Sequence, residues 1–277
     1  MATLKSLAAQ IKSLKNIGKI TKSMRMVSAS KFSKAQLAVK DARVFGEAAE
    51  IYYERAEIRL LPGTLPENLY IAMTSDRGLC GAANAQICRY IKDDLKQHRN
   101  ELNHIICVGV ISRNTLKFEY AEKISLVVDK VGAKPYTFLD ASKLASSILT
   151  MDEGFNNGKI VFNELKSVTS YRTIATSIYS LATVFAAPKM NFYDNLDPET
   201  VQSFFEFSLT CLLYRAMVES SASEHSARLI AMENASRNAE KVKNKVSVQF
   251  NRNRQAAITK ELTEIVSGAT AVNTAKN

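Results

Sequence analysis

The beginning of the chain carries apolar residues at helical spacing. From Leu4 to Val27, leucine, isoleucine, methionine and valine recur every three or four positions, and no proline occurs before Pro62. This pattern predicts one helix within residues 1–60. A helix of roughly 55 residues would reach about 80 Å at a rise of 1.5 Å per residue, so it needs a long partner.

The end of the chain supplies that partner. After Pro198, the last proline, the pattern is helical from Phe204 onward, and alanine is frequent on its apolar side. Between Met232 and Phe250 the spacing averages close to a heptad repeat. We therefore predict a second helix over residues 204–273 that folds back on the first as a long antiparallel coiled coil. The alternative is two amphipathic helices folded over the middle domain.

Residues 66–200 have a different periodicity. Short apolar runs of strand type alternate with segments of helical pattern. The predicted strands lie at 69–73, 104–108, 124–128, 159–162 and, antiparallel, within 169–181, and the predicted helices lie at 82–98, 112–120 and 137–151. This alternation predicts the α/β class, with a three-layer, Rossmann-like domain around a mostly parallel sheet.

Charge is concentrated in the two predicted terminal helices. Residues 1–40 hold eight lysines, one arginine and no acidic residue, so they carry +9 of the net +10. Residues 233–260 hold seven basic and two acidic residues, which gives +5 and leaves about −4 for the remainder. Such an asymmetry indicates a polyanionic partner: nucleic acid, a phospholipid surface or an acidic protein cavity. Phe32 is the one aromatic residue in the first forty, which favours a protein cavity over nucleic acid.

The turn after the first predicted strand is the main candidate for small-molecule chemistry. In an α/β fold such a turn can hold a phosphate, but this one contains neither GxGxxG nor a P-loop, and a glycine is also needed for the turn itself. A structural or protein-contact turn is therefore favoured over a nucleotide site. The turn consists of Ser75, Asp76, Arg77, Gly78, Leu79, Cys80 and Gly81.

Other signatures of catalysis or metal binding are missing from the sequence. Neither HExxH nor GxSxG occurs, and the three histidines and four cysteines lack ligand-like spacing. We interpret the cysteines as reduced thiols and Cys80 as a small buried residue. The sequence predicts no catalytic residue, no cofactor and no metal, so the chain alone is not expected to be an enzyme.

The last part of the second predicted helix is apolar or small. No charged residue occurs between Glu264 and Lys276. An apolar helix end exposed to water is costly, so an apolar sleeve in another protein is expected to enclose it. The residues of this apolar tip are Ile258, Leu262, Ile265, Val266, Gly268 and Ala269.

Four stretches resemble the γ subunits of F-type ATP synthases over essentially the whole chain. They are residues 17–27 (IGKITKSMRMV), the turn 75–81, residues 232–239 (MENASRNA) and residues 258–271, which follow the pattern IT-x-E-xx-[DE]-xxx-GA-x-[SAKR]. Residues 251–255 (NRNRQ) also look like the family's NRxRQ segment. Residues 82–86 (AANAQ) depart from the forms usual in this family.

The resemblance implies a non-catalytic rotor shaft inside a ring of three α and three β subunits. The α/β domain would be a foot on the membrane c-ring, accompanied by the small δ and ε subunits, with peripheral membrane association through the complex and no nucleic acid. Arg254 and Gln255 would contact a β subunit, and Arg89 and Lys92 would form a second ionic contact with β. The β-subunit lever would face Met24, Arg25 and the basic band, and the tip would turn in the sleeve at the top of the ring.

The amino-acid sequences of these stretches resemble those of mitochondrial γ subunits most. The resemblance therefore implies the matrix side of the mitochondrial inner membrane, with a bacterial or chloroplast membrane as the alternative. The competing hypotheses from other classes are a nucleotide-binding α/β protein that uses the turn 75–81, and a basic coiled-coil protein that binds nucleic acid.

Overall fold

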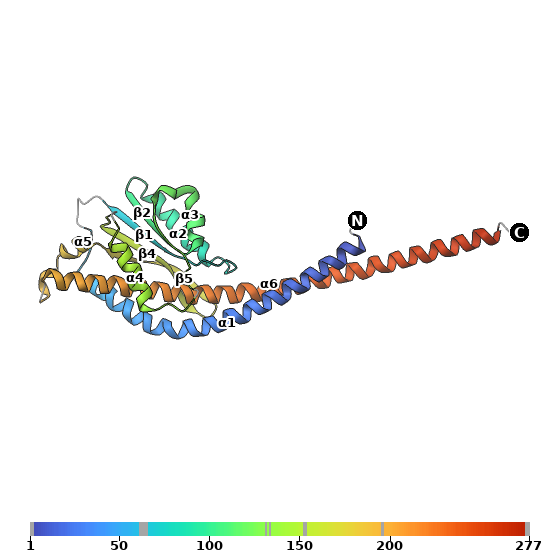
Figure 1. Ribbon diagram of the computed structural model, residues 1–277, viewed down its shortest axis with the longest axis horizontal. Coiled ribbons are helices and arrows are strands. Elements are labelled where there is room, and N and C mark those ends of the chain that lie inside the picture. Colours follow the sequence, from blue (N-terminus) through green and yellow to red (C-terminus); the bar gives the residue numbers. More distant parts are fainter. Residues whose placement is uncertain are drawn as a thin grey trace. The chain divides into compact units, whose positions relative to one another are not determined.

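The computed structural model describes residues 3–60, 66–130, 132, 134–151, 154–194 and 197–274. Two long helices, α1 (Leu4–Arg55) and α6 (Pro198–Thr274), flank a mixed α/β region in the sequence (Figure 1). The α/β fold with long terminal helices is the predicted fold class, and it is confirmed. α6 begins at Pro198 rather than at residue 204. Asp197 caps this end by accepting hydrogen bonds from Thr200 N (3.1 Å) and Thr200 Oγ1 (2.7 Å), and proline suits the first helical position because it lacks an N–H.

The sheet has the strand order β3-β2-β1-β4-β5. Strands β1 (Glu67–Met73), β2 (Leu102–Val108), β3 (Ile124–Val128) and β4 (Asn157–Ser167) are parallel to their neighbours, whereas β5 (Ser170–Tyr179) is antiparallel to β4. All five predicted strands are present, and the last one has the predicted antiparallel direction. β4 is longer than its predicted core of 159–162 because it continues into a hairpin with β5.

Helices cover both faces of the sheet, which makes the predicted three layers (Figure 1). α2 (Ala83–Gln97) and α3 (Val110–Tyr120) pack on one face through Ile91 and Leu116 against Tyr70 and Ile105. The opposite face carries Ile71 and the alternate residues of the other strands, in one core with α4 (Phe138–Leu149) and parts of α1 and α6. Short elements complete the described chain: η1 (Ala121–Lys123), α5 (Leu181–Phe185) and η2 (Met190–Phe192).

The chain forms two compact units, and both long helices contribute to each. One unit is Met1–Met26 with Met232–Asn277, and the other is Val27–Ala231. The predicted division into 1–60, 66–200 and 204–273 follows the helices and the sheet instead, and it stays a prediction. The boundary between the units falls inside each long helix, because residues 27–55 and 198–231 share their core with the sheet.

Within each unit α1 and α6 run antiparallel. In the larger unit Arg43 pairs with Glu219 (2.5 Å) and Glu50 with Arg215 (2.7 Å), so a higher number on α1 meets a lower one on α6. Gly46 lies at the closest approach, where an added Cβ would be 2.2 Å from Arg215 Cδ. In the smaller unit Arg25 is 4.0 Å from Glu233. The predicted antiparallel pairing is therefore present, and residues 27–55 and 198–231 also pack over the sheet, as the alternative expected.

The edge of β4 beyond β1 is completed by side chains. β1 pairs with β4 as far as Val161, and from Asn163 onward the backbone groups on that edge have no strand beside them. Leu165 N donates to Glu219 Oε2 (2.8 Å), and Arg43 Nη2 donates to Leu165 O (2.5 Å). Ser223 of α6 likewise donates to Asn163 O at 2.9 Å. Polar residues of both long helices therefore take the place of a neighbouring strand.

Candidate functional site

The smaller unit carries an exposed basic band on α1. The side chains of this basic band are spaced by three, four or seven residues, so they share one side of the helix. The lysines are exposed, and none forms an ion pair with a carboxylate of the described residues. Arg25 is partly exposed beside Glu233, and Met24 next to it is also partly exposed. The basic band consists of Lys5, Lys12, Lys15, Lys19, Lys22 and Arg25.

Arg254 and Gln255 are exposed on α6 in the same unit. Arg25 lies beside Glu233, and in antiparallel helices of equal rise each step back along α1 is matched by one step forward along α6. Leu4, the first residue of α1, then comes opposite position 254. Arg254 and Gln255 therefore lie at the position on α6 where its pairing with α1 ends.

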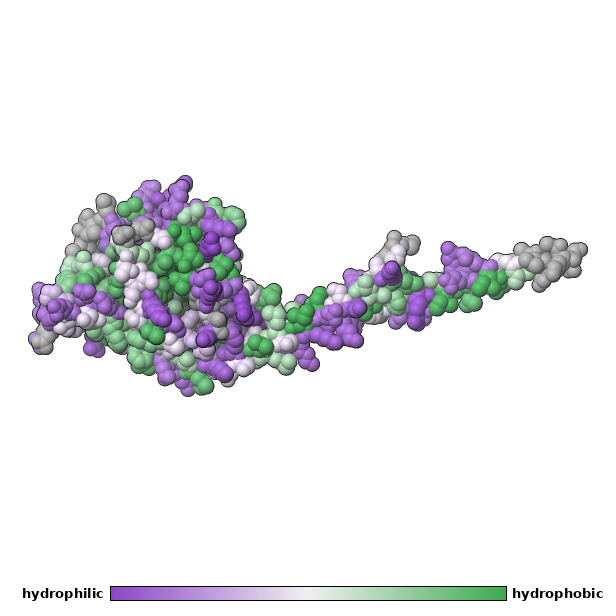
Figure 2. All heavy atoms as spheres, viewed as in Figure 1, coloured by the Kyte–Doolittle hydropathy of each residue, from purple (hydrophilic) through white to green (hydrophobic). Residues whose placement is uncertain are grey.

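The apolar tip of α6 is exposed. Ile258 is 48% exposed, Leu262 57%, Ile265 67% and Val266 63%, and Gly268 and Ala269 are exposed as well. Figure 2 shows hydrophobic residues on the surface of this part of the chain, beside hydrophilic ones. The apolar tip is therefore exposed in the structure, and its enclosure by a sleeve stays a prediction.

Arg89 and Lys92 lie on α2 in the larger unit. Arg89 is exposed, whereas Lys92 Nζ forms an ion pair with Glu119 of α3. A contact of Lys92 with another protein would therefore compete with Glu119. Arg89 and Lys92 belong to the other compact unit from Arg254, Gln255 and the tip.

Residues of the turn 75–81 form hydrogen bonds with other parts of the chain. Asp76 Oδ1 accepts a hydrogen bond from Val110 N (2.9 Å) at the start of α3, and Asn84 Nδ2 donates to Ser75 Oγ (2.9 Å). Arg228 Nη2 donates to the carbonyl oxygens of Arg77 (3.1 Å) and Gly78 (3.2 Å). The turn therefore ties β1, α3 and α6 together, which supports the structural interpretation over a nucleotide site.

Leu79 and Gly81 shape the same turn. Both have a positive φ, 61° for Leu79 and 60° for Gly81, and Leu79 is 63% exposed. A leucine rarely adopts this left-handed conformation. Cys80 between them is buried, and burial raises the pKa of its thiol, which disfavours a nucleophilic thiolate.

The other cysteines are buried and free, and burial raises the pKa values of Cys88, Cys107 and Cys211 to about 11. Across the described residues, no group of three or more His, Cys, Asp or Glu side chains is placed to hold a metal ion. None of the described helices combines the length and apolar character needed to cross a membrane.

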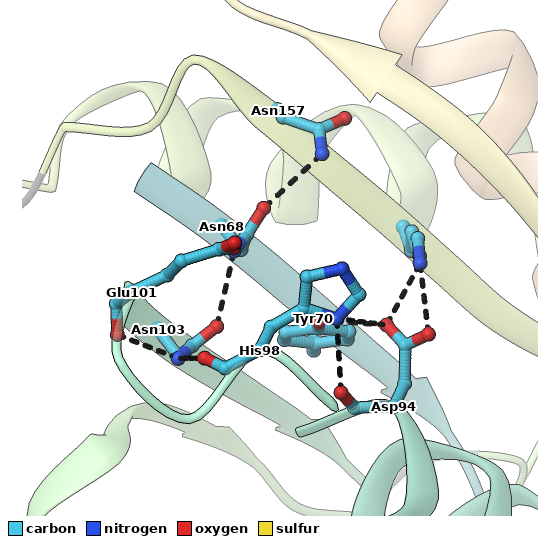
Figure 3. A network of polar contacts seen from close by, with 8 residues as sticks. Asn68, Tyr70, Asp94, His98, Glu101, Asn103 and Asn157 are labelled. Atoms are coloured by element: carbon cyan, nitrogen blue, oxygen red, sulfur yellow. Dashed lines mark hydrogen bonds and ion pairs between the residues drawn. The ribbon is translucent and has the colours of Figure 1, made fainter. Parts of the chain in front are cut away.

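A polar network closes the amino ends of the parallel strands (Figure 3). Asn68 of β1 donates to Asn103 of β2 (3.1 Å) and accepts from Asn157 of β4 (3.1 Å), and the three residues are in register. Asp94 of α2 pairs with Lys159 (2.7 Å) and accepts from Tyr70 Oη (2.7 Å). Burial opposes ionisation of Asp94, but these two partners prevail and lower its pKa.

These features define a class of protein in which paired antiparallel helices, basic and apolar on their exposed surface, continue from a three-layer α/β domain. A family model described as ATP synthase matches residues 3–272. Curated relatives include the mitochondrial ATP synthase subunit gamma of Drosophila melanogaster, 46% identical over 98% of this chain and 91% of the relative. The mitochondrial ATP synthase F(1) complex subunit gamma of Rattus norvegicus is 42% identical over 98% of this chain and all of the relative. The chain belongs to the ATP synthase gamma subunit family.

Solved structures agree with this assignment. A chain of the Euglena gracilis mitochondrial ATP synthase, described as OSCP/F1/c-ring, has a TM-score of 0.84 over 99% of this chain and 96% of that one, and at 19% identity it supports the fold. A chain of the Tetrahymena thermophila mitochondrial ATP synthase central stalk and c-ring has a TM-score of 0.67 at 25% identity, over 78% of this chain and 99% of that one. The names of the curated relatives confirm the predicted mitochondrial localisation.

Sequence reasoning missed the charged residues that join the long helices to the sheet. Arg43 and Glu219 are 176 positions apart, and nothing in the local pattern links them. The capping box of α4 could have been found, because Thr137 and Asp140 have the T-x-x-D spacing, and the structure shows both of its hydrogen bonds.

Proposed function

We propose that this gamma subunit is the central rotor shaft that couples rotation of a membrane ring to ATP synthesis and hydrolysis at catalytic sites on other subunits. Its smaller unit would lie within a ring of three α and three β subunits. Its α/β domain would contact the c-ring and the small δ and ε subunits on the matrix side of the inner membrane. The related Euglena gracilis and Tetrahymena thermophila assemblies, described as F1 with c-ring and as central stalk with c-ring, support these partners.

The observation that carries the proposal is the unneutralised basic band on a helix pair. Exposed helices usually mix charges of both signs, but the five lysines of this band have no carboxylate partner among the described residues. An acidic cavity would neutralise them, and steering by such a cavity also favours assembly. The apolar tip, with Ile265 67% exposed, fits an apolar sleeve at the end of the same cavity.

The shaft would act through differential contact with chemically identical partners. α1 and α6 expose different residues on different sides, so each orientation presents a different surface to each β subunit. A rotor can shift the nucleotide affinity of a site only by as much as its contact free energy differs between the states of that site. Arg254 and Gln255 are the proposed contacts on α6, Arg89 and Lys92 those on α2, and Met24 and Arg25 those on α1.

The turn 75–81 supports a non-catalytic role. The turn 75–81 contacts α3 and α6 through Asp76 and Arg228, and its thiol at Cys80 is buried with a raised pKa. No nucleotide, cofactor or metal is needed for the proposed role. Its chemistry is the exchange of ionic and apolar contacts during rotation.

Native mass spectrometry of the endogenous complex tests this function. One copy of the chain for every six α and β subunits is expected, because a single asymmetric axle is required. A homo-oligomer without nucleotide-binding partners would contradict the proposal. Binding of ATP by the isolated chain would instead support a nucleotide site at the turn 75–81.

A further inference from the structure

A small pocket lies in the larger unit between α1, α6 and the segment that precedes α4. Its volume is about 90 Å³. A buried site needs only about 10–15 Å³ on this measure to hold one water, so the pocket has room for a tetrahedral oxyanion. Among the described residues that line it, none is an aspartate or a glutamate and three are lysines. The polar lining consists of Lys31, Lys34, Lys134, Tyr136, Ser221 and His225.

His225 is the buried polar group of this pocket, with 8% of its surface exposed. Its Nδ1 lies 3.3 Å from Arg228 Nη1. A guanidinium can only donate, so Nδ1 accepts and the ring proton is placed on Nε2. Nε2 has no hydrogen-bond partner among the described residues, so its N–H is free to donate to an anion bound in the pocket that His225 lines.

The electrostatics around His225 are positive. Burial, followed by the charges of Arg228, Lys31 and Arg77, lowers its pKa to about 4, so the ring is neutral near pH 7. Glu224 is the nearby carboxylate, and it forms an ion pair with Arg228. The cations around the ring are therefore only partly compensated by the chain itself.

The three lysines of the pocket are also uncompensated. Lys34 and Lys134 are exposed and Lys31 is partly exposed, and none has an ion pair with a carboxylate of the described residues. Ammonium groups and an imidazole N–H are donors, so the charged and ring groups of the lining offer donors without a competing carboxylate. Charge-assisted hydrogen bonds to phosphate-type oxygens are the strong interactions such a lining can make.

We propose that this pocket binds a small free oxyanion of the phosphate class, held by Lys31, Lys34 and Lys134, with a hydrogen bond from His225 Nε2. The site lies within residues 27–231 and uses none of the residues proposed to contact β subunits. Its existence is therefore independent of the rotor function.

Titration of the full chain with inorganic phosphate tests the site. The readout is the proton NMR signals of the three histidines of the chain. A bound anion stabilises the imidazolium, so phosphate is expected to raise the pKa of His225, whereas sodium chloride at equal ionic strength is not. The double variant Lys34→Ala with Lys134→Ala should bind phosphate about tenfold more weakly. The control Lys117→Ala removes an exposed lysine of α3 outside the pocket and should bind as the unaltered chain does.

Three results would overturn the proposal. The first is a His225 signal that does not respond to phosphate, and the second is an equal response in the double variant. The third is a stronger response to a glycerophosphate diester than to inorganic phosphate, which would assign the pocket to a lipid headgroup instead of a free anion.

Discussion

Arg43 of α1 donates from Nε to the carboxylate of Glu219 of α6 at 2.5 Å, and the Glu219 side chain is fully buried. The same pair holds both backbone groups of Leu165, since Glu219 accepts from its N–H and Arg43 donates to its carbonyl oxygen. One ion pair thus joins the two long helices to β4.

Removing Arg43 is expected to cost more stability than neutralising Glu219. Arg43→Ala leaves a buried carboxylate without its cation and should lower the free energy of unfolding by about 3–5 kcal/mol. Glu219→Gln keeps an acceptor for Leu165 N and leaves an arginine whose side chain is 36% exposed, so about 1–2 kcal/mol is expected. Urea unfolding of the purified chain measures both.

Arg237→Ala is the matched control for these variants. Arg237 pairs with Glu233 on the same helix, but its side chain is 68% exposed, so its loss should change stability by less than about 1 kcal/mol. If Arg43→Ala were no more destabilising than Arg237→Ala, the Arg43–Glu219 ion pair would not be what stabilises the contact between the long helices and β4.

The same substitution at two glycines of α1 should have opposite effects. Gly46→Ala places a Cβ 2.2 Å from Arg215 Cδ, so the helices must separate, at a cost of about 1–3 kcal/mol. Gly18→Ala meets no atom within 4 Å and should stabilise the helix by about 0.5–1 kcal/mol. The unfolding temperatures of the two variants, compared with that of the unaltered chain, show whether the two stability changes have opposite signs. Equal shifts in one direction would show that Gly46 is not at a close approach.

Stability should fall as the pH drops from about 6.5 to about 4. Burial lowers the folded-state pKa of His225 to about 4, whereas an unfolded histidine titrates near 6.5. In that interval the unfolded chain binds a proton that the folded chain does not, so this contribution is fully present above pH 6.5 and is lost as the pH falls. The difference amounts to roughly 3 kcal/mol.

Unfolding free energies across this pH range, in buffers without phosphate, measure the effect. His225→Gln should flatten the profile between pH 6.5 and 4 because the titrating group is gone. An unchanged slope in the variant would mean that His225 is not the residue responsible.

Arg254→Ala should lower the ATP turnover of the assembled complex without abolishing nucleotide binding, because the proposed contact affects affinity differences between sites. Arg252→Ala is the matched control. Both arginines are exposed, and two helical positions separate them by about 200° around the axis, so they face different sides. Unchanged turnover for Arg254→Ala, or an equal loss for Arg252→Ala, would remove this role from Arg254.

Periodicity was sufficient to predict the long helices and the alternating α/β region. The central strand Glu67–Met73 ends in the apolar run Leu69–Met73, because a central parallel strand is covered on both faces. The start of α6 was predicted too late. The cap at Asp197 and Pro198 is a local signal, but the apolar pattern alone begins only further along the helix.

The candidate surfaces were predictable to different degrees. The basic band and the apolar tip are visible because charge and apolar residues are segregated along one helix. The contacts of Arg228 with the turn 75–81 depend on residues about 150 positions apart. Such contacts arise only when the helix packs beside the end of β1, and no local pattern encodes them.

Rotation of this chain within the intact complex is the most direct measurement of its proposed role as the rotor shaft. A reporter can be attached through Lys117→Cys on α3, since the four native cysteines are buried, while the complex is immobilised through its β subunits. If the chain is the shaft, the reporter turns in one direction relative to the fixed ring while ATP is hydrolysed. A reporter that stays stationary during hydrolysis would contradict the assignment of this chain as the rotor shaft.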